Sequence, residues 1–168
     1  QVVDLNAGKY LEDDLKNTSQ TKFCIGVAGY PEKHFEAPNM DSDLHYLKMK
    51  VDMGADYIVT QMFFDNEKFF AFVKSCREAG IKVPIIPGLK PIYTKKQLTS
   101  LPKIFHIDVP TALSKEIIKC QADEDVEKVG TEWLLQQSRE LKKSGVPVLH
   151  YYTLGRPHIV GNVVKQIM

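Results

Sequence analysis

Polar residues that could take part in chemistry are densest in one segment, residues 30–38, which reads YPEKHFEAP. Its only histidine, His34, stands near four carboxylate residues: Glu32, Glu36, Asp41 and Asp43. Imidazole and carboxylate groups are ligands for zinc and iron. No second histidine follows His34 at a spacing of two to five residues, and the loop is equally well interpreted as a solvated acidic surface. We therefore predict no metal site.

Gln61 occupies an unusual position, late in the apolar run YIVTQMFF of residues 57–64. A buried amide must find hydrogen-bond partners, and leaving it without them costs about 1–3 kcal/mol. The same amide offers donors and an acceptor side by side, which suits it to reading a planar heterocycle. The alternative is that a neighbouring loop backbone satisfies the amide. Both interpretations stay open at this point.

Two basic residues could neutralise an anionic ligand. Lys50 lies at the end of the polar face of a predicted helix, Asp43–Met53, with Lys48 two residues before it. Lysines on such faces are ordinarily solvated. Arg156 closely follows the last apolar run, and its guanidinium could bind a carboxylate through two parallel hydrogen bonds. The alternative for Arg156 is an ordinary surface position.

Four apolar runs predict the strands that position these residues. The runs are nearly continuous rather than strictly alternating, which is typical of parallel strands covered on both faces. They are Phe23–Tyr30, Tyr57–Phe64, Val83–Leu89 and Val146–Thr153. Ligands of parallel α/β proteins bind beyond the carboxyl ends of the strands, so the residues that follow each run are the candidates for a binding site.

Segments of helical period separate the strands. Apolar residues recur at every third or fourth position in three of them: Asp43–Met53, Glu67–Ala79 and Asp123–Ser144. A glycine stands at or just after the end of each segment, and a strand is expected two or three residues later. Glycine readily adopts the left-handed conformation that ends a helix, so Gly54, Gly80 and Gly145 are predicted helix terminators.

The stretch from residue 90 to residue 145 is longer than one crossover helix and predicts at least two. Pro102 and Pro110 are expected to break it, with Thr111 or Ser114 capping a helix that follows. The whole chain therefore reads as repeated βα units in a single domain, residues 1–168. Four parallel strands could form a small open sheet or half of an eight-stranded barrel, which usually needs about 250 residues.

The start of the chain favours the barrel. The sequence begins at Gln1 rather than at methionine, and its opening residues read as the tail of a helix. We therefore expect the front of a larger protein to be missing. On this interpretation the chain is an α/β fold that supplies the last four βα units of a (β/α)8 barrel of the TIM-barrel class.

Composition excludes several classes of protein. The chain has 22 Lys and Arg residues against 21 Asp and Glu residues and no basic block, which argues against nucleic-acid binding. No apolar run approaches the about 20 residues that span a bilayer, and the first residues lack the layout of a signal peptide. Three widely spaced cysteines fit the reduced thiols of a cytoplasmic protein. The motifs of Rossmann dinucleotide sites and P-loops are absent.

Five short blocks occur in an order that resembles the methylenetetrahydrofolate reductases. They are AGYPEKH (28–34), KMKVDMGA (48–55), TQMFFD (60–65), IIPGLKP (85–91) and HYYTL (150–154). Each block lies at the carboxyl end of a predicted strand or on the helix that follows one. The resemblance implies a (β/α)8 barrel in which these blocks belong to the fifth to eighth strands.

The resemblance also implies a flavin enzyme of one-carbon metabolism. This family uses FAD, reduced by NADH or NADPH, to convert 5,10-methylenetetrahydrofolate to 5-methyltetrahydrofolate by hydride transfer. The positions that match FAD-lining residues are Ala28, Tyr30, His34, Ala37, Asp43 and Lys50. The positions that match substrate-contacting residues are Gln61, Gln97 and Arg156.

No position in the chain matches the family's catalytic residues. The family's general-acid glutamate comes from the first strand and an aspartate that tunes the flavin comes from the fourth, so both are expected upstream of Gln1. We therefore predict that these 168 residues alone are inactive. The alternatives are a flavin-free barrel enzyme that binds a pterin or a phosphorylated substrate, and a non-catalytic half-barrel that docks on a partner or forms a homo-oligomer through its open edges.

Overall fold

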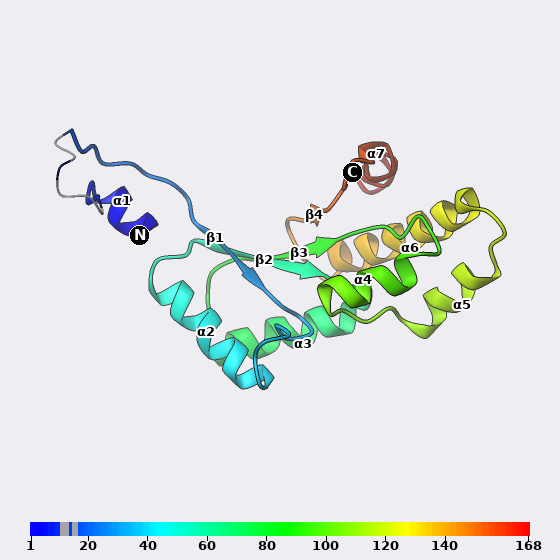
Figure 1. Ribbon diagram of the computed structural model, residues 1–168, viewed down its shortest axis with the longest axis horizontal. Helices are drawn as coiled ribbons and strands as arrows, with labels where there is room; N and C mark the ends of the chain where they lie inside the picture. Colours follow the sequence, from blue (N-terminus) through cyan, green and yellow to red (C-terminus); the bar gives the residue numbers. More distant parts are fainter. Residues whose placement is uncertain (11–13, 15–16) are drawn as a thin grey trace.

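The computed structural model describes residues 1–10, 14 and 17–168, and its centre is one sheet of four parallel strands (Figure 1). The strands are β1 (Gly26–Gly29), β2 (Tyr57–Met62), β3 (Ile85–Leu89) and β4 (His150–Tyr151). Their order in the sheet is their order in the chain, and each pairs in parallel with the next. The prediction of repeated parallel βα units is confirmed, although each strand is shorter than its apolar run.

Helices lie before, between and after the strands. They are α1 (Val2–Asn6), α2 (Met40–Asp52), α3 (Asn66–Glu78), α4 (Gln97–Phe105), α5 (Thr111–Lys119), α6 (Asp123–Lys143) and α7 (Pro157–Ile167). The three helices predicted from periodicity are α2, α3 and α6. The short α1 lies apart from the sheet (Figure 1), and part of the predicted opening segment, residues 11–13 and 15–16, falls outside the described residues. None of the described helices has both the length and the hydropathy needed to cross a bilayer.

Side-chain caps and glycines set the ends of these helices. The side chains of Asn39 and Asp65 accept backbone N–H groups in the first turns of α2 and α3, at 2.8 and 3.0 Å. The three predicted terminators follow α2, α3 and α6 with positive φ angles: +106° at Gly54, +80° at Gly80 and +84° at Gly145. A side chain is strained in that conformation, so the predicted helix–glycine–strand unit is confirmed with its physical reason.

Two predictions about the segment after β3 were wrong in detail. Pro102 lies inside α4 instead of breaking it. Leu101 of the same helix is buried in the core, and the helix ends three residues after Pro102, so packing outweighs the one backbone hydrogen bond that proline removes. Pro110 does separate α4 from α5, but it is itself the N-cap residue, and neither Thr111 nor Ser114 caps α5 with its side chain.

The helices cover one face of the sheet. Along β2, Ile58, Thr60 and Met62 are buried, and the residues between them are only half-buried. Ile58 packs against α2 and α3, and Leu89 of β3 packs against α3, α6 and α7. The prediction that both faces are covered was therefore wrong. We call the uncovered side the open face; in a closed barrel this side points to the interior.

A tyrosine bridges the strands across the open face. The hydroxyl of Tyr152, just after β4, donates to the carbonyl of Thr60 on β2 at 3.0 Å. The ring passes over Gly88 of β3, where a Cβ atom would lie 2.7 Å from the ring and 2.2 Å from the Thr60 carbonyl oxygen. Only glycine permits this approach. The two-residue strand β4 is thus tied to β2 as well as to β3.

Candidate functional site

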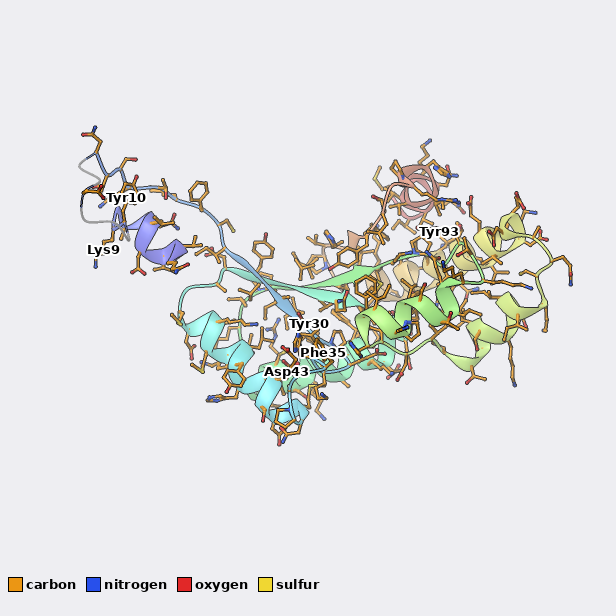
Figure 2. The ribbon with its side chains drawn as sticks, in the orientation of Figure 1. Lys9, Tyr10, Tyr30, Phe35, Asp43 and Tyr93 are labelled. Atoms are coloured by element: carbon orange, nitrogen blue, oxygen red, sulfur yellow. The ribbon has the colours of Figure 1, made fainter. Side chains whose placement is uncertain are left out.

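Three predicted cofactor residues meet where β1 ends and α2 begins. The rings of Tyr30 and His34 are 4.6 Å apart in an edge-to-face arrangement. The backbone N–H of His34 donates to the Asp43 carboxylate at 2.9 Å, and Asp43 lies in the first turn of α2. Figure 2 shows Tyr30, Phe35 and Asp43 close together beside this turn. Burial, and then the charge of Asp43, raise the pKa of Tyr30, so its hydroxyl stays protonated and can donate.

The loop between β1 and α2 folds around one lysine. Lys33 adopts a left-handed backbone conformation, φ +75°, and its ammonium donates to the carbonyls of His34 and Ala37. The Ala37 N–H donates to the His34 carbonyl at 3.0 Å, which places Ala37 directly beside His34. A non-glycine residue in this conformation is strained by about 1–2 kcal/mol. The lysine contacts offset that strain and fix the loop.

An ion network ties this loop to more distant elements. The Glu32 carboxylate accepts the Lys68 ammonium from α3 and the Asp108 N–H from the segment between α4 and α5, both at 2.7 Å. Lys68 also pairs with the Asp108 carboxylate. Sequence analysis did not identify Lys68. These contacts span 36 to 76 residues, so no local pattern could have indicated them.

Gln61 lies near Tyr30 at the carboxyl ends of the strands. Both residues line a small hollow, which Phe105, His106 and Ile107 close from the end of α4. The Gln61 side-chain oxygen accepts the Met62 N–H at 3.0 Å, where the register between β2 and β3 shifts. The amide nitrogen has no hydrogen-bond partner among the described residues. The backbone therefore satisfies only half of this amide, and its two N–H donors remain available.

The other two predicted cofactor residues lie outside this cluster. Ala28 is exposed on β1, and Gly26 two residues earlier is also exposed, so the open face of this strand carries little side-chain bulk of its own. Lys50 is exposed in the last turn of α2. It stands seven residues beyond Asp43, which is about 10 Å along the helix axis. The structure brings neither residue into contact with Tyr30 or His34.

The predicted substrate residues Gln97 and Arg156 meet at Tyr93. The Tyr93 N–H donates to the Gln97 side-chain oxygen at 2.8 Å. The guanidinium carbon of Arg156 lies 4.6 Å from the centre of the Tyr93 ring, and this guanidinium also pairs with Glu127 of α6 at 3.1 Å. Tyr93 lies apart from Tyr30 and Asp43 in Figure 2. Apart from Ala28 and Lys50, the candidate residues therefore form two groups at the carboxyl edge of the sheet.

Tyr152 connects the two groups. Burial, and then the nearby Tyr30, raise the pKa of the Tyr152 hydroxyl. Lys90, directly after β3, lies between the groups along the sheet edge and places its ammonium 4.4 Å from the Tyr93 ring centre. Both residues lie in sequence blocks that carry the family resemblance, IIPGLKP and HYYTL, but the sequence analysis assigned them no role. A charged residue directly after the buried segment IIPGL was the available signal for Lys90.

Metal and thiol chemistry have little support in this part of the chain. Within residues 1–10, 14 and 17–168, no three His, Cys, Asp or Glu side chains are close enough to hold a metal ion. Cys24, Cys76 and Cys120 are free. Burial raises the pKa of the Cys76 thiol to about 11, which makes it a poor nucleophile.

Comparison with known proteins identifies the family. The model of the family "Methylenetetrahydrofolate reductase" matches residues 5–168. A Caenorhabditis elegans protein named probable methylenetetrahydrofolate reductase (NADPH) is 39% identical over 147 residues, which cover 86% of this chain and 22% of the relative. Methylenetetrahydrofolate reductase (NADH) 1 of Arabidopsis thaliana is 39% identical over 156 residues, which cover 84% of this chain and 26% of the relative. The chain thus spans about a quarter of each relative's length.

A solved structure supports the fold. An uncharacterised Clostridium thermocellum protein that binds two copies of 5-methyl-5,6,7,8-tetrahydrofolic acid aligns with a TM-score of 0.56 at 21% identity, over 86% of this chain and 54% of that one. The sequential parallel sheet is the arrangement of half a (β/α)8 barrel, as the sequence predicted. Because the family model matches nearly the whole chain, this chain belongs to the methylenetetrahydrofolate reductase family.

Proposed function

We propose that the complete protein carrying this chain reduces 5,10-methylenetetrahydrofolate to 5-methyltetrahydrofolate in the cytoplasm, with FAD as cofactor and NADH or NADPH as reductant. Family membership supports the reaction. The names of the relatives include both NADPH and NADH, so the choice of reductant stays open. The ligand of the Clostridium thermocellum protein is the product of this reaction, which supports a folate as the substrate. The 168 residues would form one domain of that enzyme, the carboxyl half of its barrel.

One observation carries the proposal: the cofactor candidates Tyr30, His34 and Asp43 meet beside the substrate candidate Gln61 at the carboxyl ends of β1 and β2. Flavin and substrate must lie against each other for hydride transfer. Residues carried over from two different binding roles occupy adjacent strand ends, as such a reaction requires.

The chemistry of these residues fits FAD. Ala28 puts only a methyl group on the open face of β1, which leaves room for a planar ring. Lys50, about 10 Å further along α2, supplies a positive charge for the diphosphate. When bound, FAD supplies the hydride carrier between the nicotinamide and the folate. The chain's own task is to place and orient the flavin.

Gln61, Gln97 and Arg156 would orient the folate. The two N–H donors of Gln61 can reach acceptors on the pterin edge, because only its oxygen is engaged. Among the described residues the Gln97 amide nitrogen likewise has no hydrogen-bond partner, while its oxygen accepts the Tyr93 N–H. Arg156 can take a substrate carboxylate in two-pronged fashion if its pairing with Glu127 gives way. The tyrosine hydroxyl at position 30 remains a donor rather than a base, because its pKa is raised.

The test is made on the complete natural protein. Purified protein should show flavin absorbance and should oxidise NADH or NADPH when methylenetetrahydrofolate is supplied. Gln61→Ala should raise the KM for the folate by about tenfold, because at least one neutral hydrogen bond to the pterin is lost. It should have a smaller effect on turnover with menadione, an artificial electron acceptor that replaces the folate. Gln136→Ala, at an exposed position of α6, is the matched control. A colourless protein, or equal loss with both acceptors, would contradict the proposal and favour a flavin-free barrel enzyme.

A further inference from the structure

Lys90 is a buried cation without an acidic partner in the described chain. Its residue is 1% exposed, and its ammonium donates to the Pro91 carbonyl at 2.9 Å. No carboxylate among the described residues lies within 4.0 Å of the ammonium nitrogen. Burial lowers the pKa of Lys90 from 10.5 to about 8, so the side chain is still mostly protonated at neutral pH. Burying an apolar side chain of similar volume here would cost less free energy, because no charge would be desolvated.

Tyr93 connects this cation to the candidate substrate residues. Its ring centre is 4.4 Å from the Lys90 ammonium and 4.6 Å from the Arg156 guanidinium carbon. Its backbone N–H is fixed by the Gln97 side chain. The Tyr93 ring thus lies against both cations while its backbone is fixed by Gln97, so Tyr93 contacts both substrate residues predicted from the sequence.

The charges in this group are unequal. Arg156 is paired with Glu127, and His158 also approaches that carboxylate at 3.9 Å. Lys90 has no such partner in the part of the chain that the structure describes. A desolvated positive charge at the carboxyl edge of the sheet, where the family's barrel binds its ligands, is stabilised most simply by an anionic ligand.

We propose that Lys90 is a specificity-determining residue: together with Arg156 it recognises a carboxylate of the substrate's glutamate tail, and Tyr93 holds both cations in position. This inference rests on the proposed function, because the folate is the molecule that brings the tail carboxylates. The Lys90 ammonium exchanges the Pro91 carbonyl for the carboxylate when the substrate enters. Gln61 then reads the pterin at one end of the site while Lys90 and Arg156 read the charge at the other.

The experiment uses two substrates that differ only in the tail. In the complete protein, Lys90→Met should raise the KM for 5,10-methylenetetrahydrofolate by about tenfold with kcat little changed. It should leave the KM for the corresponding pteroyl amide, in which an uncharged amide replaces the glutamate, unchanged. Lys103→Met, at an exposed position of α4, is the matched control and should behave as wild type with both substrates. A KM rise of equal size with both substrates would mean a structural role and would overturn the proposal, as would no rise with either.

A second pair of variants tests the aromatic link. Tyr93→Phe keeps the ring and the backbone N–H and should retain most of the preference for the tailed substrate, whereas Tyr93→Leu removes the ring and should raise the KM for the tailed substrate only. Equal behaviour of the two variants would contradict the role given to the ring. Wild-type protein that turns over neither substrate refutes the proposed function itself. If the wild-type protein turns over the folate but the variants change the KM for both substrates equally, only the inference about Lys90 is refuted.

Discussion

Removing the buried charge of Lys90 should make the protein more stable. In the folded state burial lowers the pKa of this side chain from 10.5 to about 8, which corresponds to about 3 kcal/mol of unfavourable free energy for the charged form. The side chain is 1% exposed, so solvent screens little of this cost. Lys90→Met keeps the length of the stem and removes the ammonium. The free energy of unfolding at pH 7 should therefore rise by about 2–3 kcal/mol.

The stability gained by Lys90→Met should become smaller as the pH rises. Between about pH 8 and pH 10.5 the unfolded chain holds the Lys90 proton while the folded chain has released it, so wild-type stability rises with pH in this window. The advantage of the variant should shrink accordingly, to about 1.4 kcal/mol at pH 9.5. Tyr30 and Tyr152 have raised pKa values and titrate at high pH in both proteins, so the difference between the two proteins isolates Lys90.

Urea unfolding at several pH values between 7 and 9.5 measures this difference. Lys103→Met, in the same buffers, should match wild type throughout, because that lysine is exposed. A variant that is less stable than wild type at pH 7, or a difference that stays constant across the pH range, would refute the reasoning. If Lys90→Met is more stable than wild type and also has a higher KM for the folate, the natural lysine lowers stability in favour of substrate specificity.

Two further predictions concern close packing and the ion network. Gly88→Ala should lower the free energy of unfolding by more than about 2 kcal/mol, because its Cβ would lie 2.2 Å from a backbone oxygen of β2. In Gly161→Ala the added Cβ on α7 would meet nothing within 4 Å, so this variant should raise the free energy of unfolding by up to about 1 kcal/mol. Urea unfolding of the two glycine variants tests both predictions, and effects of the same sign would contradict them. Lys68→Met should lower stability by about 1 kcal/mol, because Glu32 and Asp108 lose their shared cation. The loss should be smaller in 1 M salt, and an unchanged loss would argue against an electrostatic origin.

Local patterns predicted most of the architecture. The left-handed glycines after α2, α3 and α6 and the order of the parallel strands follow from residue types and spacing alone. Residue types did not predict which faces of the strands the helices cover, because an apolar strand has the same sequence pattern whether its second face meets helices or a barrel interior. Pro102 was misjudged because the burial of Leu101 depends on a distant part of the chain.

The candidate site shows the same division. The resemblance named Tyr30, His34, Asp43 and Gln61, and the structure places them near one another, while their binding roles stay predictions. Lys68 escaped the sequence analysis, and Tyr93 received no role from it, because the contacts of both side chains join segments far apart in the chain. Side-chain pairing at such distances leaves no periodic trace in a single sequence.

The bridge from Tyr152 to β2 determines more than the position of a short strand. With only two residue pairs between β3 and β4, main-chain pairing alone is weak protection against a slip by one residue, and such a slip would turn every side chain of the strand to the opposite face. The phenol locks the register, because its reach across Gly88 fits one alignment only. Since α7 begins a few residues later, this hydroxyl helps to fix where the guanidinium of Arg156 lies. If Arg156 binds the substrate as proposed, Tyr152→Phe should change ligand selectivity without touching the ligand.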